Sequence, residues 1–235
     1  MKNKVVAVNY GNKYPKQYTE RLYNMVKRNT TKDFDFYVLT DNLDLYPEDH
    51  FNVIPLDRTE EGWWNKLLMF KEGVLPDGRY LYLDLDVVIV ANIDCLFDHQ
   101  RFGIIRDFIR PNDGILGGKE FNSSALSFEP QQCRGIWTHY DNNRPYWKTW
   151  QNRVHFFGDQ NVISDYLNHY PDFCNPFDDS LFWSFKKGVD RGKTAGDRSQ
   201  MFGREIPPGG KVCVFHGNPN PTEVLDVEWV KENYR

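Results

Sequence analysis

The sequence predicts an α/β fold, in which a single domain is built on a mainly parallel central sheet flanked by helices. Three observations support this prediction. Short runs of β-branched and aromatic residues recur along the chain, and segments of helical periodicity separate them. The 235 residues, 40% of them hydrophobic and 16% aromatic, suffice for one large core. No internal repeat and no low-complexity segment interrupts the pattern.

The first sixty residues alternate between strand and helix. A β-branched run over residues 4–8 predicts the first strand, which ends at the polar stretch Asn9-Tyr10-Gly11. Apolar residues then recur at helical spacing and predict a helix over 18–28. Two further runs, rich in aromatic and β-branched residues, predict strands over 34–40 and 51–56.

A second helix and a fourth strand follow. Apolar residues on one face predict a helix over 62–72, which ends before the turn Pro76-Asp77-Gly78. The apolar run from Tyr80 to Leu83 then predicts a buried strand. Because helices separate these strands, the sheet should be mainly parallel.

The second half of the chain is less regular. Residues 186–210 are rich in glycine and basic side chains, which predicts a long flexible loop of the kind that forms lids or stays disordered. The remaining expected elements are strands over 101–105, 124–128 and 211–215, a helix over 159–168 and an amphipathic helix from Asp226.

Charge and cysteine usage exclude several classes of protein. The net charge is −4 and no run of four Lys or Arg residues occurs, so a nucleic-acid partner is not expected. The apolar run at the N-terminus is too short for a signal peptide, and no stretch of about 18 apolar residues could span a membrane. We therefore expect a cytoplasmic protein; its oligomeric state, and contact of the basic loop with a membrane surface, stay open. Without a CxxC pair, reduced thiols are expected rather than a zinc site at Cys95, Cys133, Cys174 and Cys213.

Two carboxylates stand at the end of the fourth expected strand. Asp84 and Asp86 are separated by one residue, and residues i and i+2 of a strand point to the same side. Burying both charges without a counter-ion would be costly, so the pattern implies a cation or an opening to water. Carboxylate oxygens bind hard cations such as Mg²⁺ and Mn²⁺, often against a diphosphate. The DxD motif therefore predicts a metal site that handles a nucleotide-activated substrate.

Other polar stretches also follow expected strands. In parallel sheets, ligands bind beyond the carboxyl ends of the strands. We therefore expect Asn9-Tyr10-Gly11 and Asp41-Asn42 to converge on the same crevice as Asp84 and Asp86.

Six stretches, spread in order over nearly the whole chain, resemble the motifs of GT-A-fold glycosyltransferases. The resemblance is strongest to family 8, which includes glycogenin-like and bacterial galactosyltransferase-like enzymes. The six stretches are Val5 to Tyr10, Asn65-Lys66, Asp84-Leu85-Asp86, Phe121-Asn122-Ser123-Ser124, Gly158-Asp159-Gln160 and Phe215-His216-Gly217.

This resemblance implies a single GT-A (Rossmann-like) domain over 1–235. Residues 1–100 would form the nucleotide-binding half, and residues 101–235 the sugar and acceptor half. The implied activity is metal-dependent transfer of a sugar from a nucleotide diphosphate sugar, with a UDP-sugar as the expected donor. The acceptor would be the hydroxyl group of a glycan or another molecule, and the anomeric configuration would be retained.

The resemblance also implies a metal site. Asp84, Asp86 and His216 would coordinate Mn²⁺ (or Mg²⁺), which bridges the diphosphate of the donor. A nitrogen ligand beside two carboxylates favours Mn²⁺ over the all-oxygen sites that Ca²⁺ and Mg²⁺ prefer.

Further residues are implied in donor binding. Tyr10 and Tyr14 would contact the nucleobase, and Asn9 precedes them on the same loop. Lys66 would contact the diphosphate or the sugar, and Gly217 is a further donor-binding candidate. Small polar side chains supply both donors and acceptors to sugar hydroxyls, which suits Asn122, Ser123 and Ser124.

Asp159 and Gln160 correspond to the catalytic pair that lies beneath the sugar in retaining members. Asp159 could be a nucleophile only if its carboxylate comes within about 3 to 3.5 Å of the anomeric carbon, and we expect both residues to position sugar and acceptor. One departure concerns the segment after His216, where the family usually carries a lysine that neutralises the leaving diphosphate. Here Asn218 and Asn220 stand at the candidate positions. The substitutes considered are Arg191, Lys193, Arg198 and Lys211.

Two other hypotheses stay open. A nucleotidyltransferase would use a similar sheet and metal, but it should carry a glycine-rich phosphate loop, and the loop after the first strand has only Gly11. A catalytically silent nucleotide- or carbohydrate-binding module would explain the missing lysine. Aromatic residues of the second half could stack on an acceptor, although such residues are mostly core: Trp137, His139, Tyr146, Trp147, Trp150, Trp183 and Phe185.

Overall fold

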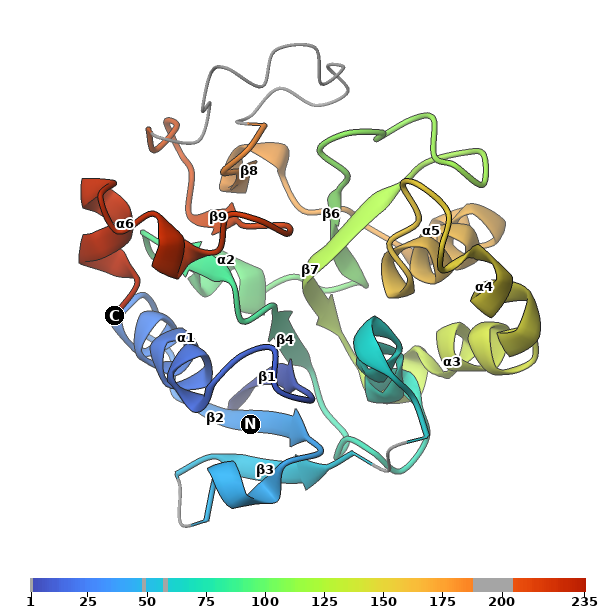
Figure 1. Cartoon of the computed structure of the whole chain (residues 1–235), viewed down its shortest axis with the longest axis horizontal. Coiled ribbons are helices and arrows are strands. Elements are labelled where there is room, and N and C mark those ends of the chain that lie inside the picture. The colour runs from blue at the N-terminus through green and yellow to red at the C-terminus, as the bar shows by residue number, and fades with distance from the viewer. Residues whose placement is uncertain (1, 48–49, 57–58, 188–204) are drawn as a thin grey trace.

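Two β-sheets form the centre of the molecule. The structure is a computed structural model that describes residues 2–47, 50–56, 59–187 and 205–235. In the described residues, the larger sheet has six strands in the order β3-β2-β1-β4-β7-β6, and the smaller has three in the order β5-β9-β8 (Figure 1).

The strands are mostly short. The larger sheet contains β1 (Asn3–Asn9), β2 (Phe34–Thr40), β3 (Asn52–Pro55), β4 (Tyr80–Leu83), β6 (Gly103–Arg106) and β7 (Phe121–Phe128). The smaller sheet contains β5 (Val87–Ile89), β8 (Phe182–Ser184) and β9 (Val212–Val214).

The helices lie mainly between these strands in the chain. They are α1 (Lys16–Arg28), the 3-10 helix η2 (Gly62–Phe70), α2 (Asp94–Phe97), α3 (Arg134–Asp141), α4 (Arg144–Trp150), α5 (Asp159–His169) and α6 (Glu228–Asn233). Shorter 3-10 turns cover Leu43–Leu45, Pro130–Gln132, Pro171–Phe173, Asp179–Leu181 and Pro221–Glu223. None of the helices in the described part of the chain combines the length and apolar character that a membrane span requires.

The larger sheet is mainly parallel, as predicted. β1 pairs in parallel with both β2 and β4, and β2 pairs in parallel with β3. β7 runs antiparallel to its neighbours β4 and β6. The start of β7 therefore lies at the same edge as the carboxyl ends of β1 and β4.

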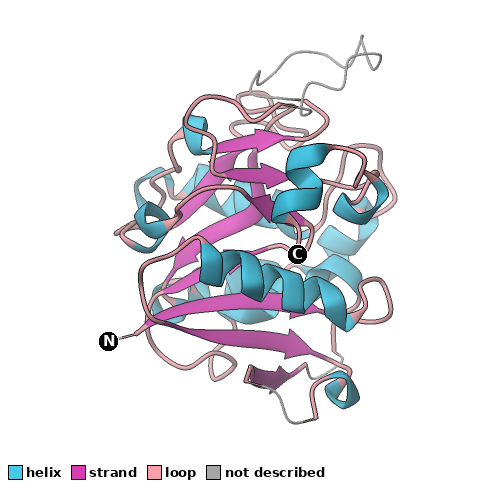
Figure 2. Cartoon of the chain, turned by 90° about the vertical axis from the view of Figure 1, so that its left-hand side faces the viewer, coloured by secondary structure: helices cyan, strands magenta, loops and turns pink. Residues whose placement is uncertain are grey.

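Helices cover both faces of the larger sheet (Figures 1 and 2). In Figure 1, α1 and α6 lie on one side, and α3, α4 and α5 on the other. Alternate residues of β1 pack into the two cores, since Val5 and Ala7 belong to the cluster with α1, while Val6 and Val8 belong to the cluster with η2, α3 and α5. Burial on both faces explains the continuous β-branched sequence of this strand.

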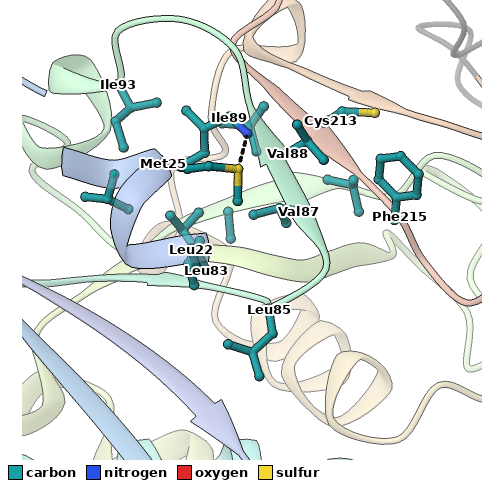
Figure 3. Packing of buried hydrophobic residues seen from close by; sticks show 14 of the residues in the cluster. Leu22, Met25, Leu83, Leu85, Val87, Val88, Ile89, Ile93, Cys213 and Phe215 are labelled. Atoms are coloured by element: carbon teal, nitrogen blue, oxygen red, sulfur yellow. Dashed lines mark hydrogen bonds between the residues drawn. The ribbon is translucent and has the colours of Figure 1, made fainter. Parts of the chain in front are cut away.

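The chain passes from the larger to the smaller sheet through the DxD motif. Asp84 to Asp86 form a turn between β4 and β5, so the expectation that both carboxylates share one face of a strand is wrong. Val87 to Ile89 then pack against Leu22 and Met25 of α1, and the Ile89 N–H donates to the Met25 sulfur at 3.4 Å (Figure 3). The turn is thus fixed on both sides by buried strands.

Other elements differ from the expectation in type or were not expected. The segment expected as an α-helix over 62–72 is the 3-10 helix η2, in which every residue from Trp64 to Phe70 is buried. Burial all round removes the single apolar face on which the helix prediction depended. The helices α3 and α4 were not expected, because their aromatic residues were considered as an acceptor surface.

Candidate active site

A cavity of about 340 Å³ lies at the edge where the strands of both sheets end. It is lined by residues after β1 and β4, at the start of β7, at the start of α5 and after β9. All the predicted site residues except Asn9 line it: Tyr10, Tyr14, Lys66, Asp84, Asp86, Asn122, Ser123, Ser124, Asp159, Gln160, His216 and Gly217. Segments more than 200 residues apart in the chain therefore meet here.

Asn9 points elsewhere. Its side chain is buried, and the amide Nδ2 donates to the Tyr46 hydroxyl at 3.0 Å. The polar stretch Asp41-Asn42 lies beside the cavity rather than in it. Together with Tyr10 and Gly11 it lines an adjoining cavity of about 590 Å³, and the Gly11 N–H donates to Asp41 at 2.8 Å.

The pairing of β4 with β7 brings Asp84 next to the predicted sugar-binding residues Asn122, Ser123 and Ser124. Leu83 pairs with Ala125, so the next residue, Asp84, lies beside Ser124 and donates its N–H to the Ser124 carbonyl at 2.9 Å. The side chain of Asn122 accepts the Ser124 N–H at 3.0 Å. This local bonding fixes the start of β7 against the DxD turn.

A buried lysine neutralises two carboxylates of the cavity. Lys66 Nζ lies 3.0 Å from Asp84 and 3.2 Å from Asp159, and Ser123 Oγ donates to Asp159 at 2.7 Å. Burial lowers the pKa of Lys66, but the charges of Asp159 and Asp84 outweigh burial and raise it above its usual value. Lys66 is therefore a cation in this structure, and its side chain is only 10% exposed.

Asp86, the second aspartate of the motif, forms no ion pair with a lysine among the residues that the structure describes. Tyr14 donates its hydroxyl to Asp86 Oδ2 at 2.8 Å. Burial and the neighbouring charge of Asp84 raise the pKa of Asp86 to about 7. The two carboxylates therefore concentrate negative charge, which a cation between them would relieve.

The smaller sheet places His216 near the DxD turn. Val87, directly after Asp86, pairs with Val214 in the antiparallel ladder of β5 and β9. The ring of His216 stacks on Phe108, with centroids 5.8 Å apart, and its Nε2 is 2.6 Å from Ser184 Oγ. Burial, with further contributions from Lys186 and Lys187, lowers the pKa of His216 to about 4. The imidazole is therefore neutral near pH 7, as a metal ligand must be.

The donor set of these three residues suits Mn²⁺, since two carboxylates and a neutral imidazole line one cavity. As the side chains stand, no three His, Cys, Asp or Glu residues in the described ranges are close enough to hold an ion. Asp84 contacts Lys66, Asp86 contacts Tyr14, and His216 contacts Ser184. Binding of an ion would exchange these contacts for metal ligation.

Gln160 is held by a carboxylate that the sequence analysis missed. Gln160 Nε2 donates to Asp107 at 3.3 Å, and its Oε1 accepts from Asn122 Nδ2 at 3.3 Å. Asp107 is buried and also accepts the Ile109 N–H at 2.6 Å. Asp107 directly follows β6, so the criterion of polar residues after strands would have found it.

The remaining lining residues carried no clear signal in the sequence. Trp63 and Phe157 are 38% and 39% exposed. The other residues that the sequence analysis did not single out are Val8, Lys13, Tyr82, Leu85, Phe108 and Ile109.

The aromatic residues considered for an acceptor are mostly core. Trp137, Trp147, Trp183 and Phe185 are all buried. Tyr146 is half exposed but does not line the cavity. An acceptor surface made by this group is therefore not supported.

The substitutes for the missing lysine are not gathered at the cavity in the described residues. Lys211 lies at the opposite end of β9 from His216, with Nζ donating to the Asn92 carbonyl at 2.7 Å. Arg191, Lys193 and Arg198, with most of the expected loop, lie outside the described residues.

Solved structures with the same fold are glycosyltransferases. The galactosyltransferase LgtC, in complex with donor and acceptor sugar analogues, has a TM-score of 0.67 at 14% identity over 97% of this chain and 94% of its own. The glycosyltransferase GlyE of Streptococcus pneumoniae TIGR4 has a TM-score of 0.65 at 14% identity, and the match covers 99% of this chain and 62% of GlyE.

Sequence comparison adds nothing to this likeness: no protein-family model matches the chain, and neither does any curated protein. The likeness in structure confirms the predicted fold class. The chain has the GT-A fold of these glycosyltransferases.

Proposed function

We propose that the protein is a glycosyltransferase that transfers a sugar from a nucleotide diphosphate sugar, most simply a UDP-sugar, to a hydroxyl group of an acceptor. One observation carries the proposal. On the fold of LgtC and GlyE, a single cavity gathers the DxD carboxylates, His216, the polar start of β7, and Asp159 with Gln160. The donor and acceptor analogues bound to LgtC support the same two substrate classes here.

Charge in the cavity supports a metal requirement. Four carboxylates line it, those of Asp84, Asp86, Asp107 and Asp159, against the ammonium groups of Lys13 and Lys66. A diphosphate would add negative charge to this excess. Mn²⁺ held by Asp84, Asp86 and His216 would act as a Lewis acid on the leaving diphosphate.

In the proposed reaction, the bond between the anomeric carbon and the diphosphate oxygen breaks, and its electron pair leaves with the diphosphate. The acceptor oxygen forms the new bond to carbon, and its proton passes to an oxygen of the departing diphosphate. No protein nucleophile is needed for retention if the acceptor attacks from the side of the leaving group.

The contacts of Asp159 and Gln160 favour this route. The Asp159 carboxylate is held by Lys66 and Ser123, and both amide atoms of Gln160 are bonded, to Asp107 and Asn122. Side chains held in this way suit positioning of the sugar more than nucleophilic attack. The cytoplasmic location expected from the sequence stays a prediction.

The test is a thermal-shift screen with UDP, GDP, CDP and ADP, each with and without Mn²⁺. We expect stabilisation by one nucleoside diphosphate, UDP, only when Mn²⁺ is present, because ligand binding to the folded state raises its stability. Release of that diphosphate from matching sugar donors should follow. A binding module would give the shift without turnover, and absence of any shift would contradict the proposal.

A further inference from the structure

Three strands of the smaller sheet end at the same place. β8 and β9 run parallel, with Ser184 opposite Val214, so the residues that follow both strands lie side by side. β5 runs antiparallel to β9, which brings Asp86, directly before β5, to this end as well. The sheet therefore gathers Asp86, His216 and Lys186, which lie far apart in the sequence.

Lys186 follows β8 and lies beside the segment after β9 that carries His216. The ring of Phe185 stacks on that of Phe215, with centroids 4.4 Å apart, and this contact fixes the two chain segments against each other. Lys186 Nζ donates to the His216 carbonyl at 2.6 Å. A Cβ atom built on Gly217 would lie 3.2 Å from the same nitrogen. The ammonium thus donates to His216 and lies close to Gly217, and both of these residues line the cavity.

The group that accepts the hydrogen bond from the Lys186 ammonium is the His216 carbonyl, which carries no charge. In the described part of the chain, Lys186 forms no ion pair with a carboxylate, and its side chain is half-buried. The charge of Asp86 attracts it, opposing the effect of burial, which lowers the pKa of Lys186. A cation in this position can bind an incoming anion without first giving up a carboxylate.

The two ammonium groups that line the cavity itself, those of Lys13 and Lys66, are less suited to this role. Lys66 is held between Asp84 and Asp159. Lys13 is exposed and lies 4.6 Å above the ring of Tyr14, so solvent screens its charge. Lys186 combines partial burial with a neutral partner, so its charge is available for a charge-assisted hydrogen bond to a phosphate oxygen.

We propose that Lys186, delivered by β8 rather than by the segment after the histidine, binds the diphosphate of the donor. The inference rests on the proposed function. When the donor binds, the ammonium exchanges the carbonyl of His216 for a phosphate oxygen and forms a charge-assisted hydrogen bond. It then offsets the charge that remains on the diphosphate when the bond to the sugar breaks. This assignment accounts for Asn218 and Asn220, where no cation is available.

The experiment is calorimetric titration of the full chain with UDP, UMP and Mn²⁺. The variants are Lys186→Met, Lys186→Arg and the control Lys211→Met, whose Nζ likewise donates to a backbone carbonyl but at the opposite end of β9. In the presence of Mn²⁺, Lys186→Met should weaken UDP binding by roughly ten- to a hundredfold. UMP binding should change much less, and Lys186→Arg should recover most of the loss.

Titration with Mn²⁺ alone distinguishes the loss of the Lys186 charge from damage to the structure of the loop. Removing a cation beside His216 should leave Mn²⁺ affinity unchanged or increase it, whereas damage to the loop would weaken UDP, UMP and Mn²⁺ together. That uniform loss, or wild-type UDP affinity in Lys186→Met, would overturn the inference while the proposed function stands. If the wild-type protein binds none of UDP, GDP, CDP and ADP, the proposed function fails, and this inference fails with it.

Discussion

Lys66 balances the charge of the cavity in the absence of a ligand. Its ammonium contacts both Asp84 and Asp159, and all three side chains are at least three-quarters buried. A buried ion pair often contributes little net stability, but removal of one partner leaves the other charge without compensation. Lys66 therefore allows two acidic groups to be held in the site before donor and metal arrive.

We predict that Lys66→Met destabilises the protein by about 3 to 5 kcal/mol, the usual effect of leaving a buried charge unpaired. Urea unfolding at pH 7 measures this loss. In a second variant, Lys66→Met with Asp159→Asn, one of the two uncompensated charges is removed and part of the stability should return. An unchanged urea midpoint in Lys66→Met would show that water, not the lysine, compensates the carboxylates.

A second residue links stability to pH. Glu120 is buried, and burial together with the charge of Asp107 raises its pKa to about 7. Its usual pKa in an unfolded chain is about 4.3. Between these values the folded state binds more protons than the unfolded state, so the free energy of unfolding falls as pH rises and levels off above pH 7.

The corresponding prediction concerns Glu120→Gln, which keeps an acceptor for Asn161 but removes the charge. The wild-type protein should lose stability between pH 5 and pH 8, by up to roughly 1.4 kcal/mol per pH unit within the titration range. The variant should lose less over the same interval. Urea midpoints at both pH values give the comparison, with the exposed Glu205→Gln as control. Equal pH dependence of Glu120→Gln and wild type would contradict the prediction.

At the scale of the elements, the start of α5 depends on a close contact with η2. Gly158 precedes Asp159 and has φ +60°, and a Cβ atom there would lie 2.1 Å from the indole of Trp63. Gly117 has a similar positive φ of +85°, but an added Cβ would meet nothing within 4 Å. Gly117 therefore shows the backbone cost of a positive φ alone, whereas Gly158 combines a backbone cost with a steric clash.

We predict that Gly158→Ala destabilises the protein more than Gly117→Ala does. Gly117→Ala should show the backbone effect alone, about 1 to 2 kcal/mol, while Gly158→Ala also has to displace Trp63. Thermal unfolding of both variants, and of Gly158→Ala combined with Trp63→Ala, measures the difference. Measured against Trp63→Ala alone, the effect of Gly158→Ala should be smaller than in the wild-type protein, because the clashing ring is gone and only the backbone cost remains. Equal losses in the two glycine variants would refute a role for the contact.

The elements that the sequence revealed are those with a local pattern. The apolar parts of β1 and β4 are buried on both faces and read as continuous apolar runs, and β2 reads from its aromatic and β-branched residues. Polar residues after these strands correctly indicated the edge of the sheet. β5 and β8 have three residues each, too few for any periodicity, whereas the apolar run over 211–215 correctly predicted β9. The sequence analysis placed Asp84 and Asp86 in a strand, because nothing local in Leu83 to Val87 reveals that the chain changes sheets there.

At the scale of the whole molecule, the cavity exists only when both sheets are assembled. The register of β5 with β9 brings His216 to Asp86, and the pairing of β4 with β7 brings Asn122 to Asp84. Pairings of this kind join residues more than 30 positions apart, so no local pattern could predict them. The resemblance to known enzymes supplied the grouping of the site residues, and the direction of the Asn9 side chain and the contacts of Lys186 emerged only from the packing.

Because the ligands of the proposed metal come from both sheets, metal and donor should stabilise the whole fold together. At a hundred times its dissociation constant a ligand contributes about 2.7 kcal/mol, which for a chain of this size raises the melting temperature by roughly 5 to 10 °C. We predict that the wild-type protein shows this rise with UDP and Mn²⁺, and that Asp86→Asn and His216→Ala abolish both the rise and Mn²⁺-dependent transfer. His169→Ala, which removes an exposed histidine, serves as control. Either site variant that keeps the full rise would exclude its residue from the metal site, whereas a variant that melts much lower without ligand would indicate a structural role instead.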